Sequence, residues 1–313
     1  MECDISFIGL GQMGYGMASN IRKKLSKNST MFINDVNSEA CERFANEHES
    51  YGPIEVVSTA KEAASRAPVL VSIVPAADHV RQVYLDKENG VIAAPPDKDR
   101  LILESSTIDV DSQREVGSAI RDAGVGSYYD APVSGGQWGA AAGTLAFMIG
   151  CAEDDPKASQ IRQVVSMMSH PDKIFLCGPL GNGAAAKISN NYLSGPFLLA
   201  IAESFAIGIK NGLDKDVLAN VIRNSSGMSW MGEHMHPVPG VVAGAPSSNG
   251  YKVGFRHELM VKDTTLGIEA AEKNGVEPSM ARTAVEMYRR AAGDTRTEGL
   301  DASSVYKLVF GEE

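Results

Sequence analysis

The stretch FIGLGQMGYGMASNIRKKL, residues 7–25, decides the fold. An apolar run ends in Gly9-Leu10-Gly11-Gln12-Met13-Gly14, and a helical pattern begins directly after it. A GxGxxG motif between a strand and a helix is typical of the turn that binds the phosphates of a dinucleotide. The first glycine permits a tight turn, the second lets the backbone approach a pyrophosphate, and the third lets helix and strand pack closely. The stretch therefore predicts a dinucleotide-binding βαβ unit.

A carboxylate stands about twenty residues past this motif, where the second strand ends. It belongs to Asp35, the last residue of the run Met31–Asp35. At that place a carboxylate accepts hydrogen bonds from the ribose hydroxyls of the adenosine and repels a 2′-phosphate. We therefore expect NAD as the cofactor, and a preference for NAD over NADP. The alternative is a plain glycine-rich turn beside a solvated strand end.

Short apolar runs alternate with helical patterns through the first half of the chain. The expected strands are Ile5–Leu10, Met31–Asp35, Val69–Val74 and Leu101–Ser105, with Leu145–Gly150 and Lys173–Cys177 extending the same sheet. The expected helices are Met13–Leu25, Ser38–Ala45, Asp78–Leu85 and Asp111–Ala123. This alternation predicts an α/β fold with a doubly wound parallel sheet of the Rossmann type, in a domain of residues 1–180. Val74-Pro75 and Ser106-Thr107 then lie at the edge where open sheets bind ligands.

The alternation stops near Gly183, and the rest of the chain has helical patterns. Ala184–Gly212 has the pattern of one long helix, interrupted only at Gly195-Pro196 and apolar on nearly every face, so we expect it to be buried. Further helical patterns cover Asp214–Asn224, Leu259–Asn274 and Ser279–Arg290. We therefore predict an all-α C-terminal domain, residues 181–313, that begins with the long helix.

Composition and charge argue against several classes of protein. The chain has 313 residues and a formal net charge of −10, so it lacks the basic field of most nucleic-acid-binding and polybasic membrane proteins. The most apolar stretch, Ile188–Ala202, is shorter than the roughly 20 residues that cross a membrane. Cysteines spread without a CxxC pair favour an intracellular protein. No targeting peptide is visible, so we expect the cytoplasm, or the mitochondrial matrix if a eukaryotic presequence has been removed.

Three later segments carry polar chemistry. Asp130-Ala131-Pro132-Val133-Ser134-Gly135-Gly136 ends in small residues whose amides and one hydroxyl suit a substrate carboxylate. Lys187 and Asn191 stand at i and i+4, on one face of the long helix. A lysine in so apolar a helix is costly unless it has a partner or a function, or reaches solvent at the helix start. The third segment is Lys262-Asp263, for which a solvated helix face is the simpler interpretation.

Together with the glycine motif, these segments occur in an order that resembles the β-hydroxyacid dehydrogenase family across both domains. Within it, the segments most similar to the 3-hydroxyisobutyrate dehydrogenases are Asn224-Ser225-Ser226-Gly227, Trp230, Pro237-Val238-Pro239-Gly240 and Pro246-Ser247. The resemblance implies NAD-dependent oxidation of 3-hydroxyisobutyrate, or of a close short 3-hydroxy acid, to the semialdehyde in valine catabolism. It also implies a small anionic substrate, a homodimer or homotetramer, and a site between the domains.

The resemblance implies roles for individual residues. It makes Lys187 the catalytic acid/base, and it assigns substrate binding to Ser134, Gly135, Gly136 and Asn191. It adds to the glycine motif and Asp35 five more cofactor-binding residues: Val74, Pro75, His79, Thr107 and Lys262. Three places depart from the family pattern: His79, where a small amide side chain is common, and the segments Arg256-His257-Glu258 and Thr264-Thr265. They leave the size of the pocket open. If the loop of the second domain lines the substrate cavity, the group at carbon 2 of the substrate can differ from a methyl.

Other functions compete with this one. A reductase of succinic semialdehyde or glyoxylate would have the same fold, but such members tend to use NADP, which Asp35 opposes. Imine reductases usually lack the lysine that Lys187 supplies, and a non-catalytic dinucleotide-binding scaffold has no need of it. His234 and His236 have no carboxylate or cysteine companion at a useful spacing, so we expect no metal site.

Overall fold

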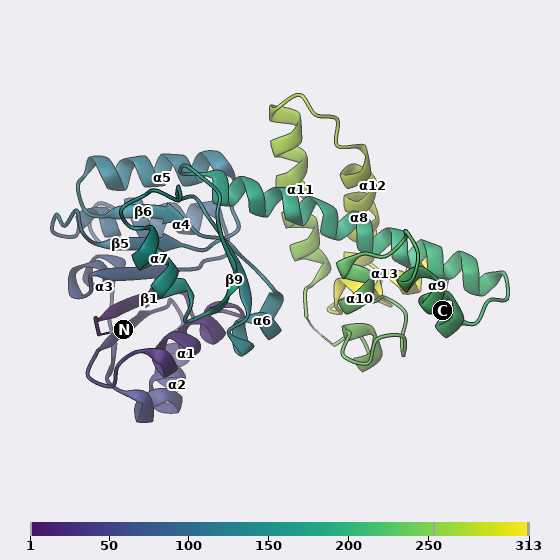
Figure 1. The fold of residues 1–313 in the computed structure, drawn as a ribbon, viewed down its shortest axis with the longest axis horizontal. Coiled ribbons are helices and arrows are strands. Elements are labelled where there is room, and N and C mark those ends of the chain that lie inside the picture. Colours follow the sequence, from purple (N-terminus) through teal and green to yellow (C-terminus); the bar gives the residue numbers. More distant parts are fainter. Residues whose placement is uncertain (1, 253, 312–313) are drawn as a thin grey trace. The chain divides into compact units, whose positions relative to one another are not determined.

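Six parallel strands build one sheet in the N-terminal part of the chain, in the order β3-β2-β1-β4-β5-β6 (Figure 1). They are β1 (Ile5–Ile8), β2 (Met31–Asn34), β3 (Ile54–Val56), β4 (Val69–Ser72), β5 (Leu101–Glu104) and β6 (Ser127–Asp130). The chain moves outward from β1 through β2 to β3 and then returns to the other side of β1 with β4. This is the Rossmann strand order, so the predicted α/β fold is confirmed.

Helices cover both faces of this sheet because the side chains of each strand alternate between them. On one face, Phe7 lies in one apolar cluster with Met17 of α1 (Gly14–Lys24) and Phe44 of α2 (Ser38–His48). On the other face, Ile8 shares a cluster with residues of three helices: α3 (Ala60–Arg66), α4 (Ala77–Leu85) and α5 (Val110–Asp122). The strands are therefore buried on both sides, and the loops at their carboxyl ends form one edge.

The two later predicted strands do not extend this sheet, so that prediction is wrong. They form a second, three-stranded sheet of β7 (Val133–Ser134), β8 (Leu145–Ile149) and β9 (Ser169–Leu176), together with α6 (Gly136–Ala142) and α7 (Ala158–Val165). β8 runs antiparallel to β7 and parallel to β9. Pro132 follows β6 and has no N–H to donate to a ladder, but its carbonyl accepts from the Met148 amide. The chain thus turns from β6 into the second sheet.

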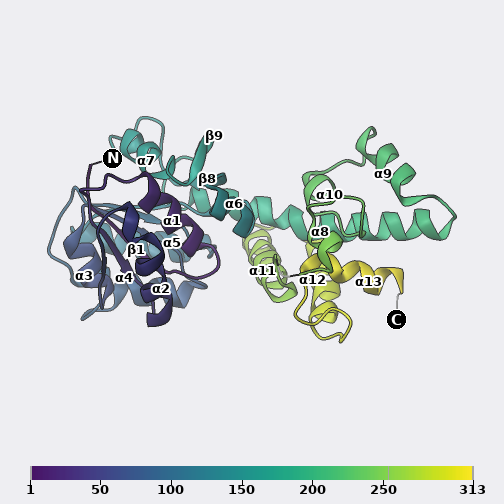
Figure 2. The same cartoon turned by 90° about the horizontal axis from the view of Figure 1, so that it is seen from below.

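The structure, a computed structural model, describes residues 2–252 and 254–311 and divides into two units, Met1–Lys187 and Ile188–Glu313. The division falls inside α8 (Asn182–Lys210), whereas the predicted boundary at residue 180 precedes this helix. The second unit continues with α9 (Lys215–Arg223), α10 (Trp230–His234), α11 (His257–Lys273), α12 (Ser279–Ala292) and α13 (Val305–Phe310). In it, α11 and α12 lie side by side (Figure 2). Short 3₁₀ turns span Glu49–Tyr51, Val91–Ala93, Pro246–Asn249 and Ala302–Ser304.

The long helix differs from its prediction in two ways. It continues through Gly195 and Pro196, where the Tyr288 hydroxyl donates to the Gly195 carbonyl at 3.0 Å. It is also not buried all round, because Leu193, Phe197 and Ile207 are exposed. Among the described residues, α8 alone is long and apolar enough to cross a membrane, a test that core helices of soluble proteins also pass. Half of its most apolar window is buried.

Candidate active site

The glycine motif forms a tight turn between β1 and α1. Gly9 has a φ of +96°, and a Cβ there would lie 2.0 Å from the Ile73 carbonyl oxygen. A Cβ on Gly14 would lie 1.9 Å from the Gly9 carbonyl oxygen, whereas one on Gly11 would meet nothing within 4 Å. The first and third glycines are therefore required by packing, and the second leaves open space beside the backbone. That is the division of tasks predicted for a pyrophosphate-binding turn.

Asp35 is tied to this turn. Its Oδ2 accepts from the Leu10 amide at 2.5 Å, and its Oδ1 accepts from the Asn37 amide at 2.8 Å. A carboxylate has about four acceptor positions, so these two bonds leave acceptor capacity for ribose hydroxyls. The hydrogen bonds fix the carboxylate at the end of β2, next to the glycine turn. This is the position at which a carboxylate binds the ribose hydroxyls of a dinucleotide.

The fit of the turn to a dinucleotide can be judged from α1 itself. Within the described residues, Met13 at the N-cap of α1 makes no side-chain capping hydrogen bond. The first amides of a helix have no partner inside it, and together with the helix dipole they favour an anion. Open space at Gly11, the missing side-chain cap at Met13 and the fixed Asp35 carboxylate therefore fit the pyrophosphate and ribose of NAD.

The remaining predicted cofactor residues of the first unit lie at the same carboxyl edge. The Val74 amide, after β4, donates to the Ser106 hydroxyl, after β5, at 2.7 Å. Pro75 and His79 are exposed, and Thr107 is half-buried. The hydrogen bond joins the two loops, while the roles of Pro75, His79 and Thr107 stay predictions.

The predicted carboxylate site is a turn that only glycine allows. Ser134 ends β7, and Gly135 and Gly136 follow with φ values of +135° and +62°. Both angles fall in the region that side chains with a Cβ disfavour. Gly135 and Gly136 are exposed and Ser134 is half-buried. Their contact with a substrate stays a prediction.

Asp130 has a function that the sequence did not reveal. Its buried carboxylate accepts from the Gly181 amide at 2.8 Å and from the Ala184 amide at 2.7 Å, at the start of α8. Burial raises the pKa of Asp130, although these amide donors oppose the rise. The carboxylate thus caps α8 from a distant strand and fixes the turn of helix that precedes Lys187.

Lys187 and Asn191 stand one turn apart on α8, as predicted, and the Lys187 side chain is buried. The Asn191 Nδ2 donates to the Asp263 Oδ2 at 2.9 Å. The other oxygen of Asp263 lies 3.5 Å from the Lys262 Nζ. Asp263 is itself buried. The structure therefore joins two predicted site residues, Asn191 and Lys262, through Asp263, a residue quoted in the motif but given no role by the sequence.

Residues that depart from the family pattern divide into two groups. His257 and Thr264 are buried, and the His257 Nε2 lies 2.9 Å from the Ser304 hydroxyl. A Cβ on Gly195 would lie 3.0 Å from the Thr264 hydroxyl, so α8 and α11 are closely packed there. Arg256 and Glu258 are exposed. Two of these residues thus belong to the core of the second unit.

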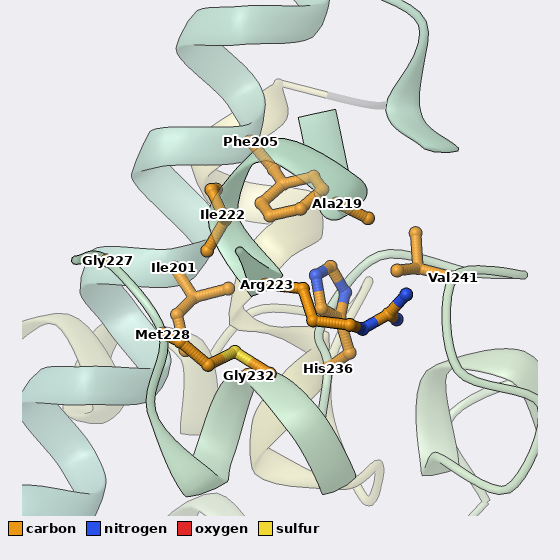
Figure 3. Close-up of a pocket in the computed structure, with 10 residues that line it drawn as sticks. All are labelled: Ile201, Phe205, Ala219, Ile222, Arg223, Gly227, Met228, Gly232, His236 and Val241. Atoms are coloured by element: carbon orange, nitrogen blue, oxygen red, sulfur yellow. The ribbon is translucent and has the colours of Figure 1, made fainter. Parts of the chain in front are cut away.

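His234 and His236 do not converge on a common point. His234 stacks on Trp230, whereas His236 is buried and its Nδ1 accepts from the Val238 amide at 3.1 Å. Figure 3 shows the His236 ring beside Phe205 and Arg223, in a pocket whose lining contains none of the predicted site residues. Burial lowers the pKa of His236 to about 4, so its imidazole is neutral at pH 7.

Two models of known protein families match the chain, one in its N-terminal part and one in its C-terminal part. Residues 4–178 match the family model described as the NAD binding domain of 6-phosphogluconate dehydrogenase. Residues 181–309 match the model described as NAD-binding of NADP-dependent 3-hydroxyisobutyrate dehydrogenase. Together the two models cover almost the whole chain.

Individual relatives agree with this. A Pseudomonas aeruginosa protein named NAD-dependent L-serine dehydrogenase is 39% identical over 91% of each chain. A protein of the same organism named 3-hydroxyisobutyrate dehydrogenase is 37% identical over 99% of each chain. A solved structure described as Mycobacterium tuberculosis 3-hydroxyisobutyrate dehydrogenase with L-serine has 35% identity and a TM-score of 0.86, covering 99% of each chain.

Proposed function

Since the chain belongs to the β-hydroxyacid dehydrogenase family and uses NAD, we propose that it oxidises 3-hydroxyisobutyrate to the semialdehyde. The observation that carries this proposal is the placement of Lys187 and Asn191 on one face of α8, with Asn191 oriented by Asp263. A general acid/base and an oriented amide are the groups that the oxidation of an alcohol requires. Valine catabolism, which produces this hydroxy acid, is part of the proposal.

The proposed mechanism separates the hydride from the proton. Bound NAD⁺ supplies the hydride acceptor for the carbinol carbon of the substrate. The Lys187 Nζ, as a neutral amine, takes the proton of the hydroxyl group, so the alcohol loses one hydride and one proton and becomes an aldehyde. In the reverse direction the Lys187 ammonium returns this proton to the carbonyl oxygen. Lys187 therefore acts as base in oxidation and as acid in reduction.

The other proposed site residues position the substrate. One N–H of the Asn191 amide donates to Asp263, which fixes the amide group. The second N–H of the same nitrogen can donate to the oxygen of the substrate hydroxyl, whose single proton goes to Lys187. Ser134, Gly135 and Gly136 offer a hydroxyl and backbone amides to the substrate carboxylate. Holding both ends of a short hydroxy acid fixes its carbinol carbon against the cofactor.

L-Serine is a second candidate substrate. It is also a 3-hydroxy acid, and it differs from 3-hydroxyisobutyrate at carbon 2, where an ammonium group replaces the methyl. The 39% identical relative is named for L-serine, and the description of the Mycobacterium tuberculosis structure includes L-serine. These relatives support a site that accepts either a methyl or an ammonium group at carbon 2 of the substrate.

Three further properties belong to the proposal. Asp35 supports a preference for NAD over NADP. The exposed apolar side chains Leu193, Phe197 and Ile207 of α8 support a homodimer or homotetramer, which light scattering would test. The four cysteines are free thiols, which supports an intracellular protein.

Initial rates test the proposal. The panel is 3-hydroxyisobutyrate, L-serine and 3-hydroxypropionate with NAD and with NADP, and succinic semialdehyde and glyoxylate with NADH and NADPH. We expect the highest kcat/KM for 3-hydroxyisobutyrate with NAD. A higher value for L-serine would replace the first candidate by the second. Preferred reduction of the aldehyde acids with NADPH would show that the protein is a reductase of such acids instead. NAD binding without any turnover would support a non-catalytic dinucleotide-binding scaffold.

A further inference from the structure

A carboxylate lies fully buried beneath the cofactor edge of the main sheet. Glu104 is the last residue of β5, and its exposed fraction is 0%. Its Oε1 accepts from the Ser106 amide at 2.9 Å, and its Oε2 accepts from the Gln113 Nε2 at 2.6 Å. Burying a charged carboxylate costs free energy, so a fold rarely keeps one that has no function. Nothing in the proposed mechanism uses it.

Glu104 reaches the cofactor edge through a single residue. The Glu104 carboxylate accepts from the Ser106 amide and so fixes the backbone of this serine. The Ser106 hydroxyl oxygen in turn accepts from the Val74 amide at 2.7 Å. The carboxylate therefore holds in place the residue whose hydroxyl binds Val74.

The other oxygen of the Glu104 carboxylate is also held by hydrogen bonds. Gln113, on α5, donates to Glu104, and its Oε1 accepts from the Tyr128 hydroxyl of β6 at 2.5 Å. The ionisable groups that face Glu104 are Tyr84 of α4 and Tyr128 and Asp130 of β6. Burial raises the pKa of Glu104 to about 7, whereas its donors favour the charged form. The chain of hydrogen bonds therefore runs from β6 and α5 through β5 to the loop after β4.

We propose that Glu104 is a positioning residue for NAD binding, which acts through Ser106 to hold the loop after β4 against the loop after β5. The inference rests on the proposed assignment of Val74, Pro75 and Thr107 as cofactor contacts. Val74 and Pro75 follow one strand, Thr107 follows its neighbour, and the Val74–Ser106 bond spans the two. Without the carboxylate the Ser106 amide loses its acceptor, the serine that binds Val74 is no longer held in place, and the two loops lose their fixed spacing.

Two measurements on the protein without substrate test this inference at pH 8.5, where the carboxyl is ionised. The first is hydrogen exchange of the Val74 amide in the cofactor-free protein. The second is the Kd for NAD by calorimetry. We expect Glu104→Gln and Ser106→Ala each to lose exchange protection at Val74 and to raise the Kd roughly tenfold, the effect of one hydrogen bond to a charged group. Glu104→Asp, which keeps a carboxylate, should bind NAD more tightly than Glu104→Gln.

The matched control is Tyr84→Phe. It removes a fully buried hydroxyl 2.6 Å from the Ser72 hydroxyl, in the same core, without touching the Ser106 link. We expect this control to lower the melting temperature but to keep the Kd for NAD and the protection of Val74. If Glu104 acts through Ser106, the double variant Glu104→Gln/Ser106→Ala should bind NAD about as tightly as Ser106→Ala alone.

Several results would overturn the inference. Wild-type protection of Val74 in Glu104→Gln would show that the carboxylate does not hold this loop. Additive losses of NAD affinity in the double variant, or an equal loss in Tyr84→Phe, would indicate a general effect on stability. Should Glu104→Gln not fold, unchanged NAD affinity in Ser106→Ala would refute the link by itself. Because none of these measurements needs a substrate, the inference can fail or succeed independently of the proposed oxidation.

Discussion

The Asn191 Nδ2 donates to the Asp263 Oδ2 across 2.9 Å, and this bond fixes the orientation of the Asn191 amide. A side-chain amide has a donor end and an acceptor end of nearly equal size. Asp263 accepts one N–H of the donor end, and the carbonyl oxygen accepts from the Asn190 Nδ2 at 3.5 Å. The second unit therefore presents a fixed amide one turn after Lys187, and the second N–H of this amide can hold the oxygen of a substrate hydroxyl while the hydroxyl proton goes to Lys187.

Asp263→Asn should weaken substrate binding more than it slows the chemical step. The neutral side chain loses the charge-assisted bond to Asn191, which typically contributes about 1.5–3 kcal/mol. We expect KM for the hydroxy acid to rise about tenfold or more, with a smaller fall in kcat. The matched control is Glu258→Gln, which neutralises an exposed carboxylate on the same helix. A KM within twofold of the wild type in Asp263→Asn would contradict the orienting role.

Asp130→Asn should impair both folding stability and turnover, because Asp130 caps the helix that carries Lys187. An amide provides one acceptor oxygen where the carboxylate provides two, so either the Gly181 or the Ala184 amide loses its partner. We expect the free energy of unfolding, measured in urea, to fall by about 1–3 kcal/mol and kcat to fall about tenfold.

The control for this variant is Asp109→Asn, at the N-cap of α5. The Asp109 carboxylate accepts from the amide and the hydroxyl of Ser112, at 2.8 and 2.6 Å, and among the residues that the structure describes it has no hydrogen bond to α8. It should show a loss of stability with an unchanged kcat. Equal kcat values in the two variants would mean that capping of α8 has no bearing on turnover.

Asp35→Ser combined with Val36→Arg should shift the cofactor preference toward NADP. The double variant removes the carboxylate that repels a 2′-phosphate and adds a cation at Val36, which is fully exposed beside it. We expect the ratio of kcat/KM for NADP to that for NAD to rise about a hundredfold, or roughly 2.7 kcal/mol. Val36→Arg alone retains the carboxylate and should keep the NAD preference. If the ratio of the two kcat/KM values is unchanged in the double variant, Asp35 does not select the cofactor.

The buried His236 predicts how stability depends on pH. Its folded-state pKa of about 4 lies below the ordinary value of 6.5, so between these values the unfolded chain binds more protons than the folded one. Its contribution to the free energy of unfolding therefore rises with pH from about 4 to 6.5, with a slope approaching 1.4 kcal/mol per pH unit, and is constant above that window.

Urea unfolding of His236→Phe at several pH values tests this slope. The phenyl ring takes the place of an imidazole that already packs edge-on against Phe205, with 4.3 Å between ring centroids. We expect the variant to lose most of the slope between pH 4 and 6.5. His234→Gln leaves the buried imidazole in place and should keep it. A wild-type slope in His236→Phe would assign the pH dependence to other groups.

Local patterns were enough to predict the fold and to place the glycine turn and Asp35 next to each other. The glycine motif, the alternating strands and Asp35 are neighbours in sequence or separated by one βα unit, so spacing alone relates them. The strands β3 and β6 lie outside the predicted set for physical reasons. β3 has three residues, mostly exposed at the edge of the sheet, and β6 has the polar sequence Ser-Tyr-Tyr-Asp.

Long-range partners could not be predicted in this way. Asp263 lies 72 residues from Asn191, and Asp130 lies more than 50 residues from the helix amides it caps. No periodicity links such pairs, since only the folded chain brings them together. The apolar composition of α8 likewise indicates a helix, but it does not reveal which of its apolar residues stay exposed.

The turnover of Lys187→Met tests the central claim most directly. The substitution keeps a long, apolar side chain in the buried position and removes the only atom that can exchange a proton. We predict a kcat for the hydroxy acid at least about a hundredfold below the wild type, with an unchanged Kd for NAD and a folded protein by circular dichroism. A kcat near that of the wild type would contradict the account, because another group would then be moving the proton.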